Sequence, residues 1–526
     1  MKNRISFLIL ITFIFSGFFV SCTKDLDRLP TNDLTATQVY STPLGYKLAF
    51  AKVYGSYAQT GNNGSGSGDI QGIDPGTSDF FRLYWYAEEF PTDEAVISWG
   101  DAGIQDFHNM NWSSSNPFLQ GLYYRSMYQI TLANDFIRQA SDANLAARGI
   151  TGNDADVIKT FKAEARFLRA YQYSVLMDMF GNPPFATDSL KIGDIPKQIQ
   201  RKDLFNYVES ELKAIEPELK APKTNEYGRA DQAADWALLA RIYLNAQVYT
   251  GTPRFDDAVT YSKKVIDAGY SLVPNYGWLF LADNNLNTNE FILTINYDGQ
   301  RTQGYGGTTF LTHAPVGGSM TPSKFGITGG WAGARTTKDL PNLFPDYTGD
   351  KDKRAEFYTD GQNIEINDIT QFNDGFSITK FKNVTRSGSP GSSLDYSDVD
   401  MPIFRLPEMY LTYAEATLRG GNGDKALALQ YVNTLRERAY GNTSGDISAG
   451  DLTLDFLLDE RGRELYWEGY RRTDLIRYGK FTSSSYVWPW KGGVKSGTGV
   501  QDYRNLYPLP NTDVTANPNL VQNPGY

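Results

Sequence analysis

Hydrophobic residues recur at helical spacing along most of the chain. Between residues 34 and 57, Leu44, Leu48, Val53 and Tyr57 follow one another every four or five positions, which predicts a helix. The same periodicity predicts helices at 119–148, 157–180, 204–219, 231–248, 255–268, 407–419 and 424–438. The protein is therefore expected to be mainly α-helical, with neighbouring helices paired across short connections.

The pattern changes between residues 268 and 407. Residues 291–296 form one short strand-like run, and 300–334 is dense in Gly and Thr with isolated aromatic residues. A second long loop is predicted at 61–76. We expect a single domain, 34–526, in which an insertion of irregular loops and short strands at about 271–406 forms a binding face on a helical scaffold.

Segment 457–481 combines many hydrophobic residues with many charges. The hydrophobic residues are too dense for one helical stripe, so the charges should pair with one another inside the protein. We predict pairs four residues apart, Asp459 with Arg463 and Glu468 with Arg472, on a long helix followed by a turn and a short helix. The segment is thus interpreted as a structural ion-pair network.

Composition narrows the possible functions. The 526 residues are 21% charged, 41% hydrophobic and 14% aromatic, with a net charge of −10 and no basic stripe, so nucleic-acid binding is not expected. The single Cys excludes an intrachain disulfide. His108 and His313 are the only histidines, so no His/Cys zinc cluster can form.

The N-terminus has the pattern of a secretory signal. Two basic residues precede an apolar run, 5–20, that is too short for a convincing membrane span, and Cys22 follows it as in a bacterial lipoprotein cleavage box. We predict a signal peptide at 1–21, acylation of Cys22, and a tether at 22–33 that anchors the protein to a membrane. The alternative is an ordinary signal peptide with an incidental Cys.

Two C-terminal segments carry a family resemblance. Residues 457–481 (LLDERGRELYWEGYRRTDLIRYGKF) and 507–526 (YPLPNTDVTANPNLVQNPGY) resemble the SusD/RagB family of surface glycan-binding lipoproteins, and 161–185 resembles a further landmark of that family. The resemblance implies four helix pairs stacked as a tetratricopeptide-like scaffold. It also implies a non-catalytic receptor on the cell surface that acts as a lid over a SusC-like TonB-dependent transporter in the outer membrane.

Aromatic residues in loops are candidates for glycan binding. Trp99, Tyr305 and Trp331 lie in predicted loops, and glycines beside Tyr305 and Trp331 should leave the ring faces uncovered. A ring can stack on the C–H face of a sugar while Asp and Arg side chains bond its hydroxyl groups. Core packing is the alternative for each ring.

The resemblance is strongest to a starch-binding member of the family. By motif context its binding residues fall on Trp99, Tyr305, Trp331, Asp74 and Arg82, which implies α-glucan or malto-oligosaccharide as the ligand. This chain departs from that pattern just past the first tryptophan, where the starch site uses an asparagine and the stretch here is Gly100-Asp101-Ala102. Another glycan or a peptide remains an alternative ligand.

A polar run offers a calcium site through Asp283, Asn285, Asn287 and Glu290, although it lacks the central glycine of an EF-hand, and a plain polar turn is favoured. No cofactor is otherwise expected.

A glycoside hydrolase would need two carboxylates across a cleft, for which Asp93 with Glu94, or Glu460 with Glu464, could be offered. Neighbouring carboxylates seldom face each other across a substrate, so the protein is not expected to be an enzyme.

Overall fold

The computed structural model describes residues 35–191 and 193–526. The predicted signal peptide, the acylation site Cys22 and the tether lie outside the described residues. Within the described part, no helix combines the length and the hydrophobicity needed to span a membrane.

The described residues are mainly helical, as predicted. The α-helices are α2 (Ala36–Val39), α3 (Pro43–Ala58), α4 (Phe80–Glu89), α5 (Asp106–Asn109), α6 (Pro117–Gln139), α7 (Asp142–Ala147), α8 (Gly152–Met179), α9 (Arg201–Ile215), α10 (Gln232–Leu244), α11 (Ala246–Thr250), α12 (Phe255–Ile266), α13 (Gly307–His313), α14 (Leu406–Leu418), α15 (Lys425–Tyr440), α16 (Leu454–Leu465), α17 (Arg471–Arg477) and α18 (Asn511–Ala516). The strands are β1 (Val96–Ile97), β2 (Pro184–Phe185), β3 (Lys197–Gln198), β4 (Phe291–Ile295), β5 (Ala334–Arg335), β6 (Phe357–Tyr358), β7 (Ser377–Ile378) and β8 (Met401–Arg405).

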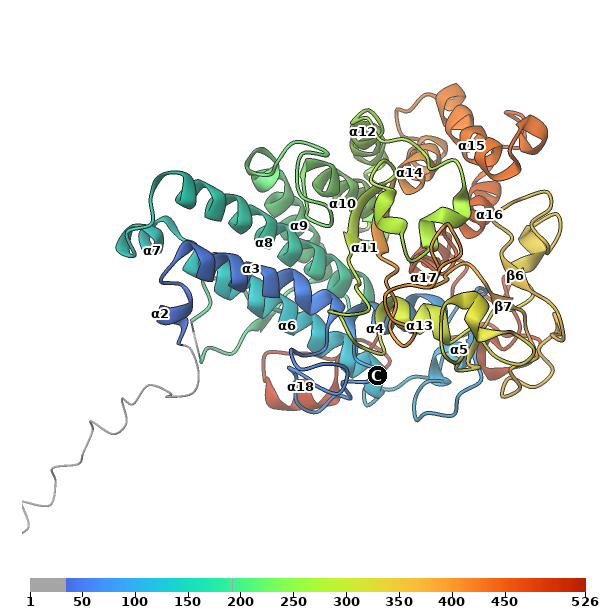
Figure 1. Ribbon diagram of the computed structural model, residues 1–526, viewed down its shortest axis with the longest axis horizontal. Helices are drawn as coiled ribbons and strands as arrows, with labels where there is room; N and C mark the ends of the chain where they lie inside the picture. Colours follow the sequence, from blue (N-terminus) through green and yellow to red (C-terminus); the bar gives the residue numbers. More distant parts are fainter. Residues whose placement is uncertain (1–34, 192) are drawn as a thin grey trace, which may run out of the picture.

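Helices that are neighbours along the chain pack side by side in space. Contacts join α6 to α8, α8 to α9, α10 to α12, α12 to α14 and α14 to α15, and Figure 1 shows these helices as a curved stack. Small residues allow the close approach, because Ala237 and Ala240 on α10 and Ala258 on α12 are all fully buried. The arrangement is consistent with the predicted tetratricopeptide-like pairs.

Local capping divides two of the predicted helices. The helix expected at 119–148 ends at Gln139, and α7 then begins at Asp142, capped by Ser141, whose hydroxyl accepts the N–H of Asn144. The helix expected at 231–248 is likewise split at Asn245, where α10 ends and α11 begins. Hydrophobic periodicity continues across both breaks, which is why the sequence pattern did not reveal them.

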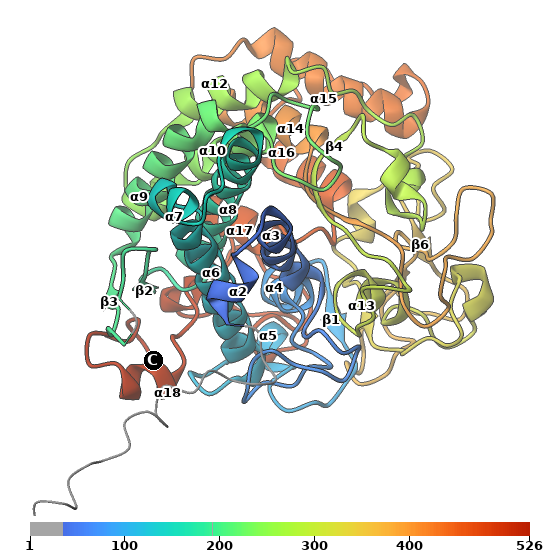
Figure 2. The same ribbon diagram turned by 60° about the vertical axis from the view of Figure 1, so that its left-hand side comes forward.

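The predicted insertion is a region of loops and small two-stranded sheets. Within it, antiparallel pairs join β4 to β8 and β6 to β7, and β5 pairs with β1 from earlier in the chain. The remaining pair, β2 with β3, lies outside the insertion, between α8 and α9. In Figure 2 the scaffold helices curve around one side and the loop-rich region, with α13 and β6, occupies the other. The short helix α13 was not expected from the Gly- and Thr-rich sequence.

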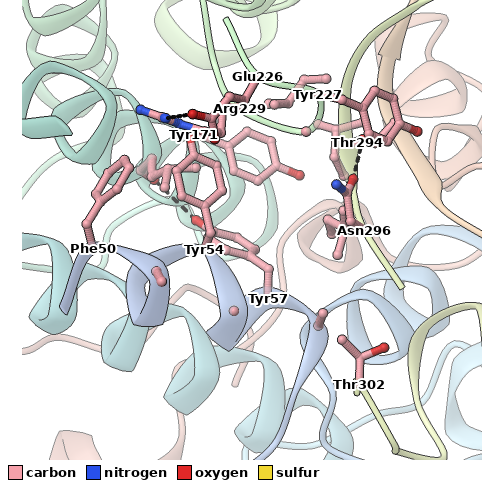
Figure 3. A pocket seen from close by; sticks show the side chains of 18 of the residues that line it. Phe50, Tyr54, Tyr57, Tyr171, Glu226, Tyr227, Arg229, Thr294, Asn296 and Thr302 are labelled. Carbon is pink, nitrogen blue, oxygen red and sulfur yellow. Dashed lines mark hydrogen bonds and ion pairs between the residues drawn. The ribbon is translucent and has the colours of Figure 1, made fainter. Parts of the chain in front are cut away.

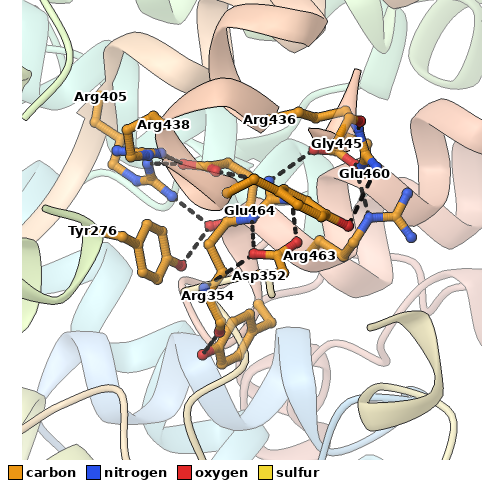
Figure 4. A network of polar contacts seen from close by, with 12 residues as sticks. Tyr276, Asp352, Arg354, Arg405, Arg436, Arg438, Gly445, Glu460, Arg463 and Glu464 are labelled. Carbon is orange, nitrogen blue, oxygen red and sulfur yellow. Dashed lines mark hydrogen bonds and ion pairs between the residues drawn. The ribbon is translucent and has the colours of Figure 1, made fainter. Parts of the chain in front are cut away.

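A buried ion-pair network joins the loop region to the scaffold (Figure 4). The Glu464 carboxylate on α16 accepts hydrogen bonds from Arg405 at 2.6 Å, Arg438 at 2.6 Å and Arg354 at 3.1 Å. Arg405 belongs to β8, Arg438 to α15 and Arg354 to the insertion. The network therefore ties three separate parts of the chain to one helix, as the charge-rich sequence indicated.

The two specific ion pairs expected from sequence were wrong. Arg463 pairs with Glu460 rather than Asp459, and Glu468 bonds Arg405 and Lys380 rather than Arg472. The first pair lies within α16, where Arg463 reaches the carboxylate three residues before it instead of the one four before it. The second pair fails because α16 ends at Leu465 and Trp467 adopts a left-handed conformation with φ of 63°. The spacing of four residues from 468 to 472 is therefore not helical, and the two side chains point to different partners.

Candidate functional site

Three aromatic side chains from separate loops meet on the loop-rich part of the molecule. The ring centroids of Trp99 and Trp331 lie 6.2 Å apart with planes inclined at 46°. Those of Tyr305 and Trp331 lie 6.3 Å apart at 64°. Trp99 and Trp331 are half-buried, whereas Tyr305 is 42% exposed. The rings thus form a bent aromatic arc, and the alternative that they are scattered through the core is excluded.

A short sheet brings the two tryptophans together. Strand β1 ends just before Trp99, β5 begins just after Trp331, and Ile97 pairs with Ala334. The Trp99 indole N–H donates to the carbonyl of Trp331 at 3.1 Å. A Cβ on Gly333 would lie 2.4 Å from the Trp99 ring, so this position requires glycine for the two loops to approach.

The buried carboxylate of Asp79 holds the loop that carries Tyr305. Its Oδ1 accepts the N–H groups of Phe81 and Arg82 at the start of α4, and also that of Gly307 at 2.8 Å. Burial raises the pKa of Asp79 to about 6, although these donors oppose the rise. Asp79 therefore connects the N-terminus of α4 directly to the turn that follows Tyr305.

Gly306 is needed for that connection. A Cβ at this position would lie 1.9 Å from the Cβ of Asp79. This close approach is a requirement for glycine that the sequence did not indicate. The role of Gly306 is to let the loop backbone approach the buried carboxylate.

Arg82 lies behind the arc, on the first turn of α4 rather than in a loop. Its Nη1 donates to the carbonyl of Tyr305 at 2.6 Å and to that of Gly76 at 3.1 Å, and Nε donates to the hydroxyl of Tyr86. The guanidinium carbon lies 5.8 Å from the ring centre of Trp99 and 5.9 Å from that of Trp331. Nη2 has no hydrogen-bond partner among the described residues, which leaves a donor beside the rings.

The two aspartates predicted to bind glycan, Asp74 and Asp101, are both exposed. Asp74 accepts the N–H of Gly76 at 2.7 Å, and the carbonyl of Gly76 accepts from Arg82, so Asp74 is linked to the arc through one loop. Asp101 follows Trp99, and its negative charge adds to the effect of burial in raising the pKa of the Tyr86 phenol. Both carboxylates thus lie within the segment that carries Trp99 and Arg82.

Two aromatic residues near the arc were missed in the sequence. Tyr396 extends it, with its ring 5.9 Å from that of Tyr305, and its hydroxyl lies 3.0 Å from the hydroxyl of Ser65. His313 lies against Trp331 with ring centres 4.9 Å apart. Tyr396 sits in a Ser- and Asp-rich loop, unlike the Gly- and Thr-rich segment of Tyr305, and its place in a polar loop could have identified it.

The proposed calcium ligands make contacts with protein donors instead. Glu290 is buried and bonds Arg405 at 3.2 Å and Arg438 at 3.4 Å, while the Asn287 side-chain oxygen accepts from Arg386. The carboxylate of Asp283 accepts the backbone N–H of Arg386, and Asn285 is exposed. Three arginine side chains near these oxygens oppose a cation, so the arrangement disfavours the calcium prediction and favours a polar turn.

The carboxylates offered for hydrolysis are held inside the protein. Burial alone would raise the pKa of Glu464, but the guanidinium groups around it, beginning with Arg438, lower it to about 2. Burial would also raise the pKa of Glu460, but nearby guanidinium groups, beginning with that of Arg354, lower it still further. A general acid needs a raised pKa, so neither residue suits that role.

The other pair, Asp93 with Glu94, is equally buried. Arg471 bonds both oxygens of Asp93, at 2.7 Å and 2.6 Å, and outweighs burial to lower its pKa. Glu94 accepts the backbone N–H of Trp467, and burial raises its pKa to about 7. Neither carboxylate is exposed to a substrate.

Comparison with known proteins identifies the family of this chain. The chain is 36% identical to the starch-binding protein SusD of Bacteroides thetaiotaomicron, over 98% of this chain and 97% of that protein. The chain belongs to the SusD family. The model of the SusD family matches residues 347–526, which include the ion-pair network. A SusD-like protein of Bacteroides ovatus is 24% identical over 88% of this chain and 81% of its own length.

Solved structures agree on the fold. A SusD superfamily protein from Bacteroides thetaiotaomicron has a TM-score of 0.71 at 20% identity and covers 92% of this chain and all of that one. Surface glycan-binding protein A of the same organism, solved in complex with laminarihexaose, has a TM-score of 0.68 at 21% identity, covering 91% of this chain and 98% of its own. The SusD fold of this chain is thus supported over nearly its full length.

Proposed function

We propose that this SusD-family protein binds starch-type α-glucan, without cleaving it, on the aromatic arc of Trp99, Tyr305 and Trp331. The observation that carries the proposal is the inclination of the planes, 46° and 64°, between adjacent rings. Rings set at such angles match a curved chain of α-linked glucose, whereas coplanar rings would suit a flat chain. The identity with a starch-binding relative supports the same ligand.

Polar groups beside the arc would bond the sugar hydroxyls. Arg82 keeps one guanidinium nitrogen without a protein acceptor in the described residues, and the carboxylates of Asp74 and Asp101 are exposed. Charged groups make stronger hydrogen bonds to hydroxyls than neutral groups do. Because the arc is open and a glucan chain must become ordered on it, modest affinity is expected.

The proposal extends to the cell surface. Acylated Cys22 would anchor the protein in the outer membrane with the domain facing outward, and the bound oligosaccharide would pass to a SusC-like TonB-dependent transporter. The basis is the lipoprotein-like N-terminus together with membership in the SusD family.

Retardation in native gels tests the ligand class. The protein is expected to be retarded in gels that contain starch and to migrate normally in gels that contain laminarin. The second gel matters because a relative in fold was solved with laminarihexaose, which makes a β-glucan the second candidate. Retardation by laminarin alone would replace the first proposal with the second.

Incubation with starch tests the absence of catalysis. Because the paired carboxylates are buried or bonded to arginines, no new reducing ends are expected after prolonged incubation. The measurement is a reducing-sugar assay against an amylase control. Release of reducing ends by the purified protein would favour a hydrolase.

The position of Tyr305 should make binding depend on pH. The pKa of Asp79 is about 6, so its carboxylate is charged at pH 7.5 and protonated at pH 5. Protonation removes a charge-assisted hydrogen bond to Gly307, so maltoheptaose affinity should fall about threefold between pH 7.5 and pH 5. Calorimetry on wild type and Asp79→Asn checks this, because the variant should show weaker binding with little pH dependence. An equal pH dependence in both proteins would assign the titration to another group.

A further inference from the structure

A cavity of about 290 Å³ lies between helix α3 and strand β4, apart from the aromatic arc. Helices α3 and α8 and strand β4 form its walls, and residues 226–229 close one side (Figure 3). Six aromatic side chains face it, those of Phe50, Tyr54, Tyr57, Phe161, Tyr171 and Tyr227. No ring of the aromatic arc lines the cavity. Among its lining residues, Thr302 lies nearest in sequence to Tyr305.

The aromatic wall carries no net charge. Phe50 and Phe161 are stacked with centroids 4.4 Å apart and planes at 10°. Arg229 lies over both rings, at 5.2 Å and 4.9 Å, and its guanidinium group is paired with the buried carboxylate of Glu164. An ionic ligand entering the cavity would lose water without meeting an unpaired opposite charge on this wall. The two other charged residues that line the cavity, Lys47 and Glu226, are exposed, so water screens their charges. The aromatic wall therefore favours an uncharged ligand.

Most polar groups around the cavity are already bonded. The hydroxyl of Tyr54 bonds Glu164 and the N–H of Ala230, and that of Tyr227 bonds Asp400. The hydroxyl of Tyr57 donates to the carbonyl of Leu168. A carbohydrate, which carries hydroxyl groups around its whole edge, would leave most of them unpaired here.

Two polar groups keep spare hydrogen-bonding capacity. Tyr171 is 3% exposed, and no hydrogen bond joins its hydroxyl to another described residue. Tyr171 also lines a smaller cavity of about 40 Å³ beside Arg241 and Glu408. At the rim, the side-chain oxygen of Asn296 accepts from Thr294 at 2.6 Å, while its amide N–H₂ has no acceptor in the described part of the chain. One buried hydroxyl and one amide at the rim suit a ligand with a single polar group.

The volume sets the size of that ligand. An apolar cavity of about 150 Å³ accommodates benzene. A cavity of about 290 Å³ has room for two fused rings. We propose that this cavity binds an uncharged two-ring aromatic molecule that carries one hydroxyl group, independently of the glycan site. The rings would contact Phe50 and Tyr54, and the hydroxyl would bond Tyr171.

Binding of 2-naphthol to the protein, followed by its fluorescence, tests the proposal. Saturable binding of one molecule per chain is expected for the wild type. Ala51→Trp places an indole in the cavity from an exposed position on α3 and should weaken binding at least tenfold. Leu48→Trp adds the same indole to the same helix outside the cavity, at a residue that is 63% exposed, and should leave binding unchanged.

Tyr171→Phe gives a second measurement that does not depend on filling the cavity. It removes only the free hydroxyl, so a loss of about fivefold is expected. Absence of saturable binding at millimolar 2-naphthol would overturn the proposal, as would equal binding by wild type and Ala51→Trp. Loss of binding in Trp331→Ala would also overturn it, because the ligand would then lie on the aromatic arc.

Discussion

Trp331→Ala is expected to weaken maltoheptaose binding about thirtyfold. Trp331 is the middle ring of the arc, with Trp99 6.2 Å away on one side and Tyr305 6.3 Å away on the other. Removing it opens a gap between the two remaining rings and takes away one stacking surface, worth about 2 kcal/mol. Isothermal calorimetry on the purified domain measures the change directly.

Two further variants show whether the loss is specific to the arc. Trp99→Ala should also weaken binding, by a smaller factor, because Trp99 lies at one end of the arc and donates to the Trp331 backbone. Trp236→Ala is the matched control, since Trp236 is a half-buried tryptophan on α10 whose ring faces Lys264 at 4.2 Å. Unchanged affinity in both arc variants would place the glycan site elsewhere on the protein.

Glu464→Gln should lower the free energy of unfolding by about 3–5 kcal/mol. The substitution keeps the shape of the side chain but removes the charge that Arg405, Arg438 and Arg354 share. Three fully or nearly fully buried guanidinium groups would then lose a negative partner. A buried positive charge without such a partner is costly, because water cannot reach the site to stabilise it. Urea denaturation followed by circular dichroism measures the loss.

Glu437→Gln is the control for this substitution. Glu437 lies on α15 between Arg436 and Arg438 but is exposed, so its charge is screened by water and a change near zero is expected. An equally small effect of Glu464→Gln would show that the network contributes little to stability.

The same network predicts how the free energy of unfolding depends on pH. Glu464 has a pKa of about 2 in the folded protein against an ordinary value of 4.5. A lowered pKa means that the contribution of this carboxylate is complete above about pH 4.5 and is lost as the pH falls toward 2. The wild type should therefore lose stability across this range more steeply than Glu464→Gln does.

The sequence alone determined the helical scaffold and its family. Hydrophobic periodicity located the long helices because a helix needs only contacts among residues close in sequence, and Gly- and Thr-rich composition located the loop region for the same local reason. The candidate arc residues Trp99, Tyr305 and Trp331 followed from motif resemblance together with their loop context.

Only the tertiary structure decided how these pieces meet. Residues 96–97 and 334–335 pair across more than two hundred positions to bring the two tryptophans together, and no local pattern encodes that pairing. The same holds for the contact between Asp79 and Gly307 and for the partners of Glu464, which come from three distant segments. Long-range contacts depend on how the whole chain packs, so local sequence indicates which residues can bind or pair, and the fold selects their partners.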